Sequence, residues 1–238
     1  MSKVFFVGCG PGDPELITVK AKKLLQKADV IIYSGSLIPP EILKFNKKGK
    51  KVDAAKLVRE EIFELLLKNS KKGKTVVRLH DGDPAIYGAI REQIDNLQNE
   101  GIESVVVPGV TSFLASAAAL GTQLTLPGVT QTMIITRAES RTKVPKREKN
   151  SELAKHRSTL IFYLSVHLLS QITKEAIAGG YPKSTPVAVV YRASWKDQKI
   201  ITGTLSDIRK KVVSEKILSL IHISEPTRPR LISYAVFW

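Results

Sequence analysis

The sequence has very little cysteine and no apolar run long enough to cross a bilayer. Cys9 is the one cysteine among 238 residues, so an internal disulfide is excluded. A single thiol fits a reducing cytoplasm, and no neighbour in the sequence would lower its pKa, so we expect a small buried residue. No apolar stretch reaches the roughly 18 residues of a membrane span. The chain opens on a strand-like run, so we expect no signal peptide.

Motifs for binding nucleic acid or metal are also lacking, although the chain is strongly basic. A net charge of +15 suits nucleic acid, an anionic membrane or a polyanionic small molecule. The basic residues are spread over 44–51, 68–74 and 141–157, without interleaved aromatics and without a zinc-finger, RRM or KH pattern. A solvated, lysine-rich surface is the alternative interpretation. Without such a motif we expect no nucleic-acid partner. Because the four histidines are scattered, we also expect no bound metal.

In the first half, apolar strand-like runs alternate with helix-like segments. The expected strands are Val4–Val7, Val30–Tyr33, Thr75–Leu79 and Ser104–Val107. The expected helices are Leu16–Ala28, Arg59–Leu67, Tyr87–Asn99 and Thr111–Leu120. This alternation predicts an α/β fold with a parallel or mostly parallel sheet and helices on its faces.

A second α/β unit is expected after a linker rich in glycine, threonine and proline at 121–130. Its expected strands are Thr132–Thr136, Thr159–Leu164, Val187–Tyr191 and Lys199–Thr204, with helices at Leu168–Ala178 and Leu205–Val213. We therefore expect an N-terminal domain over 1–120 and a C-terminal domain over 121–217.

The segment 218–238 does not fit this pattern. Another buried strand is expected after Ile217, but Pro226 and Pro229 are residues that break a central strand. The sequence of this segment resembles the translation of a sequencing-adapter read joined to a truncated reading frame. We predict that this tail is not native; a divergent natural tail is the alternative.

Three expected strands end in glycine turns: Gly8–Gly12, Gly82–Pro84 and Pro108–Gly109. Ligands of open α/β sheets bind beyond the carboxyl ends of strands, and glycine lets the backbone approach them closely. The first turn is not a dinucleotide fingerprint, because Asp13 stands where the third glycine belongs. Asp13 and Asp83 would repel phosphate. The turns therefore predict one crevice for a phosphate-free nucleoside with positive charge, such as S-adenosylmethionine; the alternative is three unrelated tight turns.

Five motifs in order resemble the tetrapyrrole (corrin/porphyrin) methyltransferase family, over about residues 3–217. They are "VGCGPGDPELIT", "ADVIIYSGSLI", "VVRLHDGDPAIYGAIREQI", "VVVPGVTSFLASAAAL" and "VAVVYRASWKDQKIITGTL". The segments "YSGSLI" and "YRASWKD" are most similar to the branch that methylates precorrin-4 or cobalt-precorrin-4 at carbon 11. The resemblance implies two α/β domains with a cleft between them, and a homodimer. From the single cysteine and the lack of a long apolar run we expect a cytoplasmic protein without a membrane partner.

The resemblance also implies S-adenosyl-L-methionine as methyl donor and S-adenosyl-L-homocysteine as product. The implied cofactor contacts are Pro11, Asp81, Gly82, Asp83, Ile86, Thr111, Ser112, Leu164 and Ala193. The family has a further proline-alanine contact on a late strand, for which we find no matching segment after Ile217.

The reaction implied is methyl transfer to a ring carbon of a polyanionic tetrapyrrole in cobalamin biosynthesis. Asp83 is the candidate catalytic residue, through cofactor positioning and an electrostatic role toward the ring; its alternative role is only to cap the following helix. His80 is a second candidate, as proton acceptor or as a structural residue. Arg78, Arg137 and Arg192 stand near strand ends, where they could grip substrate carboxylates. Rival functions are methylation of another tetrapyrrole position, methylation of RNA ribose, or an inactive scaffold.

Overall fold

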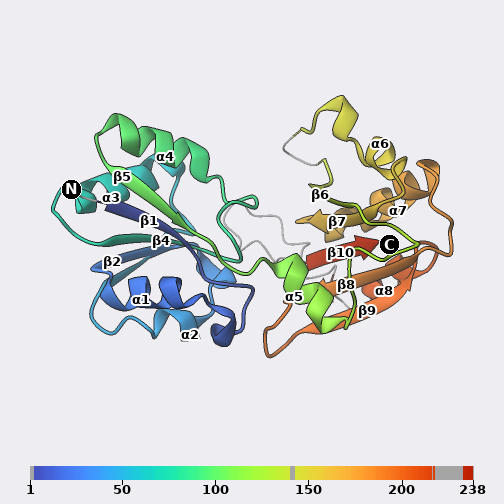
Figure 1. The fold of residues 1–238 in the computed structure, drawn as a ribbon, viewed down its shortest axis with the longest axis horizontal. Coiled ribbons are helices and arrows are strands. Elements are labelled where there is room, and N and C mark those ends of the chain that lie inside the picture. The colour runs from blue at the N-terminus through green and yellow to red at the C-terminus, as the bar shows by residue number, and fades with distance from the viewer. Residues whose placement is uncertain (1–2, 140–142, 216, 218–232, 238) are drawn as a thin grey trace. The chain divides into compact units, whose positions relative to one another are not determined.

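A computed structural model describes residues 3–139, 143–215, 217 and 233–237 (Figure 1), and these residues form two compact units. The first unit runs to Ser112 and also takes in Ser194–Lys196. The second comprises Phe113–Ala193, the described residues from Asp197 onward and the strand at 233–237. Among the described residues, no helix is both long and apolar enough to span a membrane.

The first unit is built on a five-stranded parallel sheet with the order β3-β2-β4-β1-β5. Its strands are β1 (Lys3–Gly8), β2 (Val30–Tyr33), β3 (Lys50–Asp53), β4 (Val76–His80) and β5 (Glu103–Val107). This confirms the predicted parallel sheet. The edge strand β3 was not predicted, because its sequence KKVD has a single apolar residue; lysines on an edge discourage pairing with other chains.

Helices cover both faces of this sheet. The helices are α1 (Val19–Lys27), α2 (Pro40–Leu43), α3 (Arg59–Ser70) and α4 (Ile90–Asn99), with α1 and α2 on one face and α3 and α4 on the other (Figure 1). One core packs Leu25 and Ile42 against Leu79, and the opposite core packs Leu66 and Leu97 against strand residues of the other face. The alternation of strand side chains between faces is what separates the two cores.

In the first unit, two predicted helix starts are wrong by about three residues. The helix expected from Leu16 begins at Val19, because the Thr18 hydroxyl accepts the Ala21 N–H at 3.2 Å and caps it there. The helix expected from Tyr87 begins at Ile90, because Tyr87 and Ala89 have φ of 55° and 50°, a left-handed conformation that no helix contains.

The second unit contains a mixed five-stranded sheet with the order β6-β7-β10-β8-β9. Its strands are β6 (Met133–Arg137), β7 (Thr159–Tyr163), β8 (Pro186–Tyr191), β9 (Lys199–Thr204) and β10 (Ser233–Phe237). Strands β6 and β7 are parallel, and the other pairs are antiparallel. Its helices are α5 (Ser112–Ala119), α6 (Asn150–Ala154), α7 (Leu169–Ala178) and α8 (Ile208–Ser214). The described residues therefore form an α/β fold in both units, as predicted.

Strand β10 lies at the centre of the second sheet, where Ala235 pairs with Phe162 on β7 and with Val189 on β8. Pro226 and Pro229, on which the expectation of a broken strand depended, lie outside the described residues. The backbone thus has a central strand after Ile217. Whether the tail is native stays a prediction.

The helix expected to close the N-terminal domain belongs almost entirely to the second unit. The Phe113 N–H donates to the Tyr163 hydroxyl at 3.4 Å, and Ala115 packs against Val190 and Ala193. These contacts place the division after Ser112, whereas the sequence pattern places it near 121–130.

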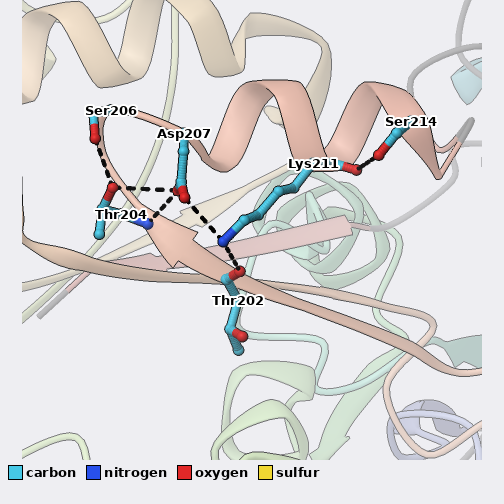
Figure 2. Close-up of polar contacts among 6 residues, drawn as sticks. All are labelled: Thr202, Thr204, Ser206, Asp207, Lys211 and Ser214. Atoms are coloured by element: carbon cyan, nitrogen blue, oxygen red, sulfur yellow. Dashed lines mark hydrogen bonds and ion pairs between the residues drawn. The ribbon is translucent and has the colours of Figure 1, made fainter.

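Polar contacts fix α8 to β9 (Figure 2). Asp207 accepts the Thr204 N–H at 2.6 Å and forms an ion pair with Lys211 at 2.9 Å. The Lys211 ammonium also donates to the Thr202 carbonyl at 3.1 Å. The Thr204 N–H and Lys211 lower the pKa of Asp207, so its carboxylate stays charged.

Candidate active site

The three glycine turns predicted from the sequence meet at one place. Strands β4, β1 and β5 are parallel neighbours, so their carboxyl ends lie at the same edge of the first sheet. The turns after β1 and β4 then pair with each other: the Gly82 N–H donates to the Gly10 carbonyl at 2.9 Å, and the Cys9 N–H to the His80 carbonyl at 2.8 Å. The three turns therefore meet, and the crevice that they were predicted to line stays a prediction.

Only glycine fits at positions 8 and 109, where the turns touch. A Cβ on Gly109 would lie 2.1 Å from the Gly82 carbonyl oxygen, and one on Gly8 would lie 2.6 Å from the same atom. A Cβ on Gly82 would lie 3.7 Å from the Cα of Thr111, in ordinary contact. We call this meeting of Gly8, Gly82 and Gly109 the glycine junction. Its tight packing fixes the backbone of all three turns.

Asp83 ties two of these turns together. One carboxylate oxygen accepts the Ala85 N–H at 2.7 Å, and the other accepts the Gly109 N–H at 3.0 Å. The Ile86 N–H donates to the Asp83 carbonyl at 3.2 Å, which closes a tight turn. Asp83 therefore caps this turn, and α4 begins seven residues later, at Ile90. The catalytic role expected of Asp83 stays a prediction.

The segment Ser194–Lys196 packs on the first turn, which the sequence did not predict. The Asp13 N–H donates to the Ser194 hydroxyl at 2.9 Å, and the Trp195 indole N–H donates to the Pro11 carbonyl at 2.9 Å. A Cβ on Gly12 would lie 2.2 Å from the Trp195 ring. The motif "YRASWKD" marked the branch, but nothing in its residue types indicated that its tryptophan would hold a turn about 180 residues earlier in the chain.

The structure brings most of the predicted cofactor contacts to this junction. Thr111 and Ser112 are buried beside Gly82. Asp81 directly precedes Gly82, and its negative charge opposes deprotonation of the neighbouring Cys9 thiol. Pro11 belongs to the first turn, and Ile86 to the turn that Asp83 caps. These contacts lie within the first unit.

Leu164 and Ala193, the remaining predicted contacts, belong to the second unit. Leu164 follows β7 with a φ of 55°, and Ala193 follows β8 and is buried against Ala115. Because β7 and β8 both pair antiparallel with β10, their carboxyl ends lie at the same edge of the second sheet. Both residues thus occupy strand-end positions, and their contact with the cofactor, which the resemblance implies, stays a prediction.

Burial controls the chemistry of the titratable groups near β4. Desolvation raises the pKa of the Cys9 thiol far above its usual range, which argues against a reactive cysteine. Desolvation, and secondarily the charge of Arg78, lowers the pKa of His80 to about 3, so its ring is neutral at pH 7. A neutral histidine next to a buried arginine is a weak base. This favours the structural interpretation of His80 over that of a proton acceptor.

The three arginines expected at strand ends have different surroundings. Arg78 is buried on β4. Arg137 ends β6 and donates to the Lys143 carbonyl at 3.5 Å, and Arg192 follows β8 and forms an ion pair with Asp197. Only Arg78 lies in the first unit, so the three do not form one cluster there.

The donor set at the junction fits a phosphate-free, positively charged nucleoside. The turns 8–14, 81–86 and 108–112 contain no lysine or arginine to pair with a phosphate. They present glycine backbone, the buried hydroxyls of Thr111 and Ser112, and the carboxylate of Asp81. A carboxylate suits ribose hydroxyls and cationic groups rather than phosphate.

Comparison with known proteins identifies the class. The family model of the Tetrapyrrole (Corrin/Porphyrin) Methylases matches residues 3–209. The chain belongs to this family.

Particular members resemble the chain closely. A cobalt-precorrin-4 C(11)-methyltransferase of Methanocaldococcus jannaschii is 51% identical over 236 residues, covering 98% of this chain and 91% of the relative. The X-ray structure of a cobalamin biosynthetic enzyme, cobalt precorrin-4 methyltransferase, superimposes with a TM-score of 0.90 at 42% identity, covering 99% and 94% of the two chains. A uroporphyrin-III C-methyltransferase of Thermus thermophilus complexed with S-adenosyl homocysteine has a TM-score of 0.76 at 30% identity, covering 98% and 91%.

Proposed function

We propose that this protein transfers a methyl group from S-adenosylmethionine to carbon 11 of cobalt-precorrin-4 or precorrin-4, a step of cobalamin biosynthesis. The observation that carries this proposal is the convergence of the three turns at the glycine junction, in a chain 51% identical to a cobalt-precorrin-4 C(11)-methyltransferase. The Thermus relative complexed with S-adenosyl homocysteine supports the choice of methyl donor.

The cofactor contacts we propose are those that the resemblance implies: Pro11, Asp81, Gly82, Asp83, Ile86, Thr111, Ser112, Leu164 and Ala193. Ser194 and Trp195 support these contacts indirectly, because their hydrogen bonds hold the backbone of the first turn. Asp83 positions the turn that carries Gly82, since both of its carboxylate oxygens accept backbone N–H groups.

The reaction requires little acid–base catalysis by the protein. When bound, S-adenosylmethionine supplies an electrophilic methyl group, and the electron-rich ring carbon of the reduced tetrapyrrole is the nucleophile. The contribution of the chain is alignment: a rigid junction holds both partners in line and can supply several kcal/mol of the barrier. The proton lost from the macrocycle needs a positioned base only if its departure limits the rate, and among the nearby groups the buried neutral His80 is poorly suited to that role.

The experiment is incubation with cobalt-precorrin-4 and methyl-labelled S-adenosylmethionine, followed by product mass and carbon NMR. One added methyl on carbon 11 is expected. Cobalt-free precorrin-4 in a parallel reaction decides which form is preferred. A label on another ring carbon would replace the proposal with a different regiochemistry. Calorimetry with S-adenosylhomocysteine beside a generic RNA completes the test; binding of the RNA, weakened steeply by salt, would instead favour RNA ribose as substrate.

We further propose that the protein acts in the cytoplasm as a homodimer. The single buried cysteine suits a reducing compartment. Analytical ultracentrifugation tests the dimer, with a monomer at micromolar concentration as the contrary result. Fractionation of the source cells tests the compartment.

A further inference from the structure

A cavity of about 570 Å³ lies in the first unit, on the face of the sheet that α3 and α4 cover. Its wall includes Arg78 and His80 on β4, Gln93 on α4, and the turn Tyr87–Ala89. Two residues of that turn, Tyr87 and Ala89, have positive φ although neither is glycine. Such strain persists where the surroundings hold it in place, and it concentrates at functional sites.

Unsatisfied polar atoms gather in this cavity. In the described part of the chain, six buried side-chain nitrogen or oxygen atoms have no hydrogen-bond partner, and three of them belong to its wall: Arg78 Nε, His80 Nε2 and Gln93 Oε1. Buried polar atoms are normally paired, and an unpaired one costs free energy. Two of these three atoms, Arg78 Nε and His80 Nε2, can donate and so point to an occupant that accepts hydrogen bonds, whereas Gln93 Oε1 is itself an acceptor and such an occupant does not satisfy it.

Arg78 determines the charge of that occupant. Its guanidinium donates to the Ile32 carbonyl at 3.3 Å and to the Ser34 hydroxyl at 2.9 Å, both neutral acceptors, and its Nε–H remains. Burial lowers the pKa of Arg78 to about 10, while Asp81 opposes the fall, so the side chain stays cationic at neutral pH. The Asp81 carboxylate, which also lines the cavity, compensates part of this charge but does not accept from the Nε–H. Water can accept from the Nε–H, but a carboxylate accepts it in a stronger, charge-assisted hydrogen bond.

His80 supplies a second donor next to Arg78. The two residues are two positions apart on β4, so both side chains project from the same face of the sheet. His80 is 8% exposed and neutral at pH 7, and in the tautomer with a proton on Nε2 it donates one hydrogen bond into the cavity. A carboxylate therefore finds a cationic donor and a neutral donor on one wall.

The rim of the cavity is acidic, which affects the kind of carboxylate that can enter it. Glu60, Glu64 and Glu92 line it and are exposed, and Glu92 is paired with Arg59 at 2.9 Å. This acidic rim repels small free anions. A carboxylate attached to a larger molecule held elsewhere reaches the inner wall at high effective concentration despite the rim.

We propose that Arg78 and His80 form a subsite for one carboxylate arm of the tetrapyrrole substrate. The proposal rests on the proposed function, since it names the part of the substrate that this wall recognises. Arg78 is then a specificity determinant for the substrate and leaves the methyl donor untouched.

The test uses the full chain in four forms: wild type, Arg78→Gln, Arg78→Lys and Arg91→Gln. Arg91 is the matched control, because it loses the same charge from an 87% exposed side chain on α4 that pairs with Asp95. Each protein is checked for thermal unfolding and for S-adenosylhomocysteine affinity, and its KM and kcat are measured with cobalt-precorrin-4. A mixture of cobalt-precorrin-4 molecules, each amidated at one carboxylate, is then offered, and the methylated regioisomers are identified by NMR.

Loss of one charge-assisted hydrogen bond is expected to raise the KM of Arg78→Gln about 10- to 100-fold, with S-adenosylhomocysteine affinity unchanged. Arg78→Lys keeps the charge but not the donor geometry, so its KM should lie between those of wild type and Arg78→Gln. Wild type is expected to discriminate against one amidated regioisomer, and Arg78→Gln to lose that discrimination.

An Arg78→Gln protein that folds and has the KM and regioisomer selection of wild type overturns the subsite and leaves the proposed function standing. If Arg78→Gln fails to fold, Arg78→Lys decides by the same selection. A wild-type protein that binds S-adenosylhomocysteine but does not methylate cobalt-precorrin-4 overturns both proposals.

Discussion

Replacing Asp83 with alanine should weaken both the fold and the affinity for S-adenosylhomocysteine. Asp83→Ala removes the acceptors of the Ala85 and Gly109 N–H groups. Loss of the cap costs about 1 kcal/mol, and loss of the second charge-assisted bond about 1.5 kcal/mol. The free energy of unfolding should therefore fall by about 2–3 kcal/mol, a decrease in Tm of roughly 4–12 °C for a chain of this size.

Asp53→Ala is the matched control, because the Asp53 carboxylate also accepts two backbone N–H groups, those of Gly35 and Ala55, both at 2.9 Å. It should cost similar stability, but S-adenosylhomocysteine affinity should fall only for Asp83→Ala, since only Asp83 is bonded to the glycine junction. Thermal unfolding and calorimetry measure the two effects. Asp83→Asn keeps one acceptor, so its free energy of unfolding should fall by about half as much as that of Asp83→Ala.

The reasoning would be refuted by an Asp83→Asn protein with wild-type Tm and wild-type S-adenosylhomocysteine affinity but no methyl transfer. In that case the charge of Asp83 would act on the reaction itself, and its bonds to the turns would be incidental. Unchanged S-adenosylhomocysteine affinity in Asp83→Ala would refute the argument differently, by showing that the junction keeps its shape without this carboxylate.

Three further perturbations test the same structure. Gly109→Ala forces a Cβ to 2.1 Å from a carbonyl oxygen, so it should lower the free energy of unfolding by about 1–3 kcal/mol and remove most of the S-adenosylhomocysteine affinity. Its control is Gly101→Ala, at a residue with φ of 71° and open space around it, which should cost about 1 kcal/mol of backbone strain and leave the affinity unchanged. Equal losses of S-adenosylhomocysteine affinity in the two variants, measured by calorimetry, would contradict this. Trp195→Phe removes the hydrogen bond to Pro11 and should weaken S-adenosylhomocysteine binding several-fold while the ring still packs. An unchanged affinity in calorimetry would show that this hydrogen bond does not position the first turn for binding. The pKa of His80 is lowered from 6.5 to about 3, so the unfolded chain binds one more proton than the folded chain between these values. The free energy of unfolding should fall by about 1.4 kcal/mol per unit as pH drops through that window, and urea titrations of His80→Gln should show a shallower slope; equal slopes would contradict the buried neutral state.

The sequence predicts those parts of the fold that have their own local signal. Apolar runs such as Val30–Tyr33 and Val187–Tyr191 lie within the observed strands, because a buried strand needs apolar residues whatever surrounds it. Strand β3 lacks that signal, since its hydrogen bonds to β2 form it rather than its side chains. The starts of α1 and α4 were missed because a threonine cap and two left-handed residues fix them, and neither is visible in hydrophobic periodicity.

The candidate site was predictable where glycine marks it. Gly8 ends β1, Gly82 and Gly109 follow β4 and β5, and parallel order puts those strand ends at one edge. The contact of Trp195 with the first turn was not predictable, because it joins residues far apart in the chain and depends on tertiary packing alone. The orphaned atoms of Arg78 and His80 were equally hidden, since the sequence placed Arg78 on a strand and His80 at its end but could not say which of their nitrogens would lack a partner.

Strand β4 links the two halves of the proposed chemistry. The main chain of His80 accepts the Cys9 N–H and so helps to build the glycine junction, while the side chain of the same residue lines the cavity proposed for a substrate arm. Only Asp81 separates His80 from Gly82. Because the junction permits so little movement, a carboxylate held by Arg78 and His80 would be fixed relative to the turns that hold the methyl donor. Alignment of donor and acceptor then requires no ordering of this segment when the substrates bind, and the conformational cost is met when the chain folds.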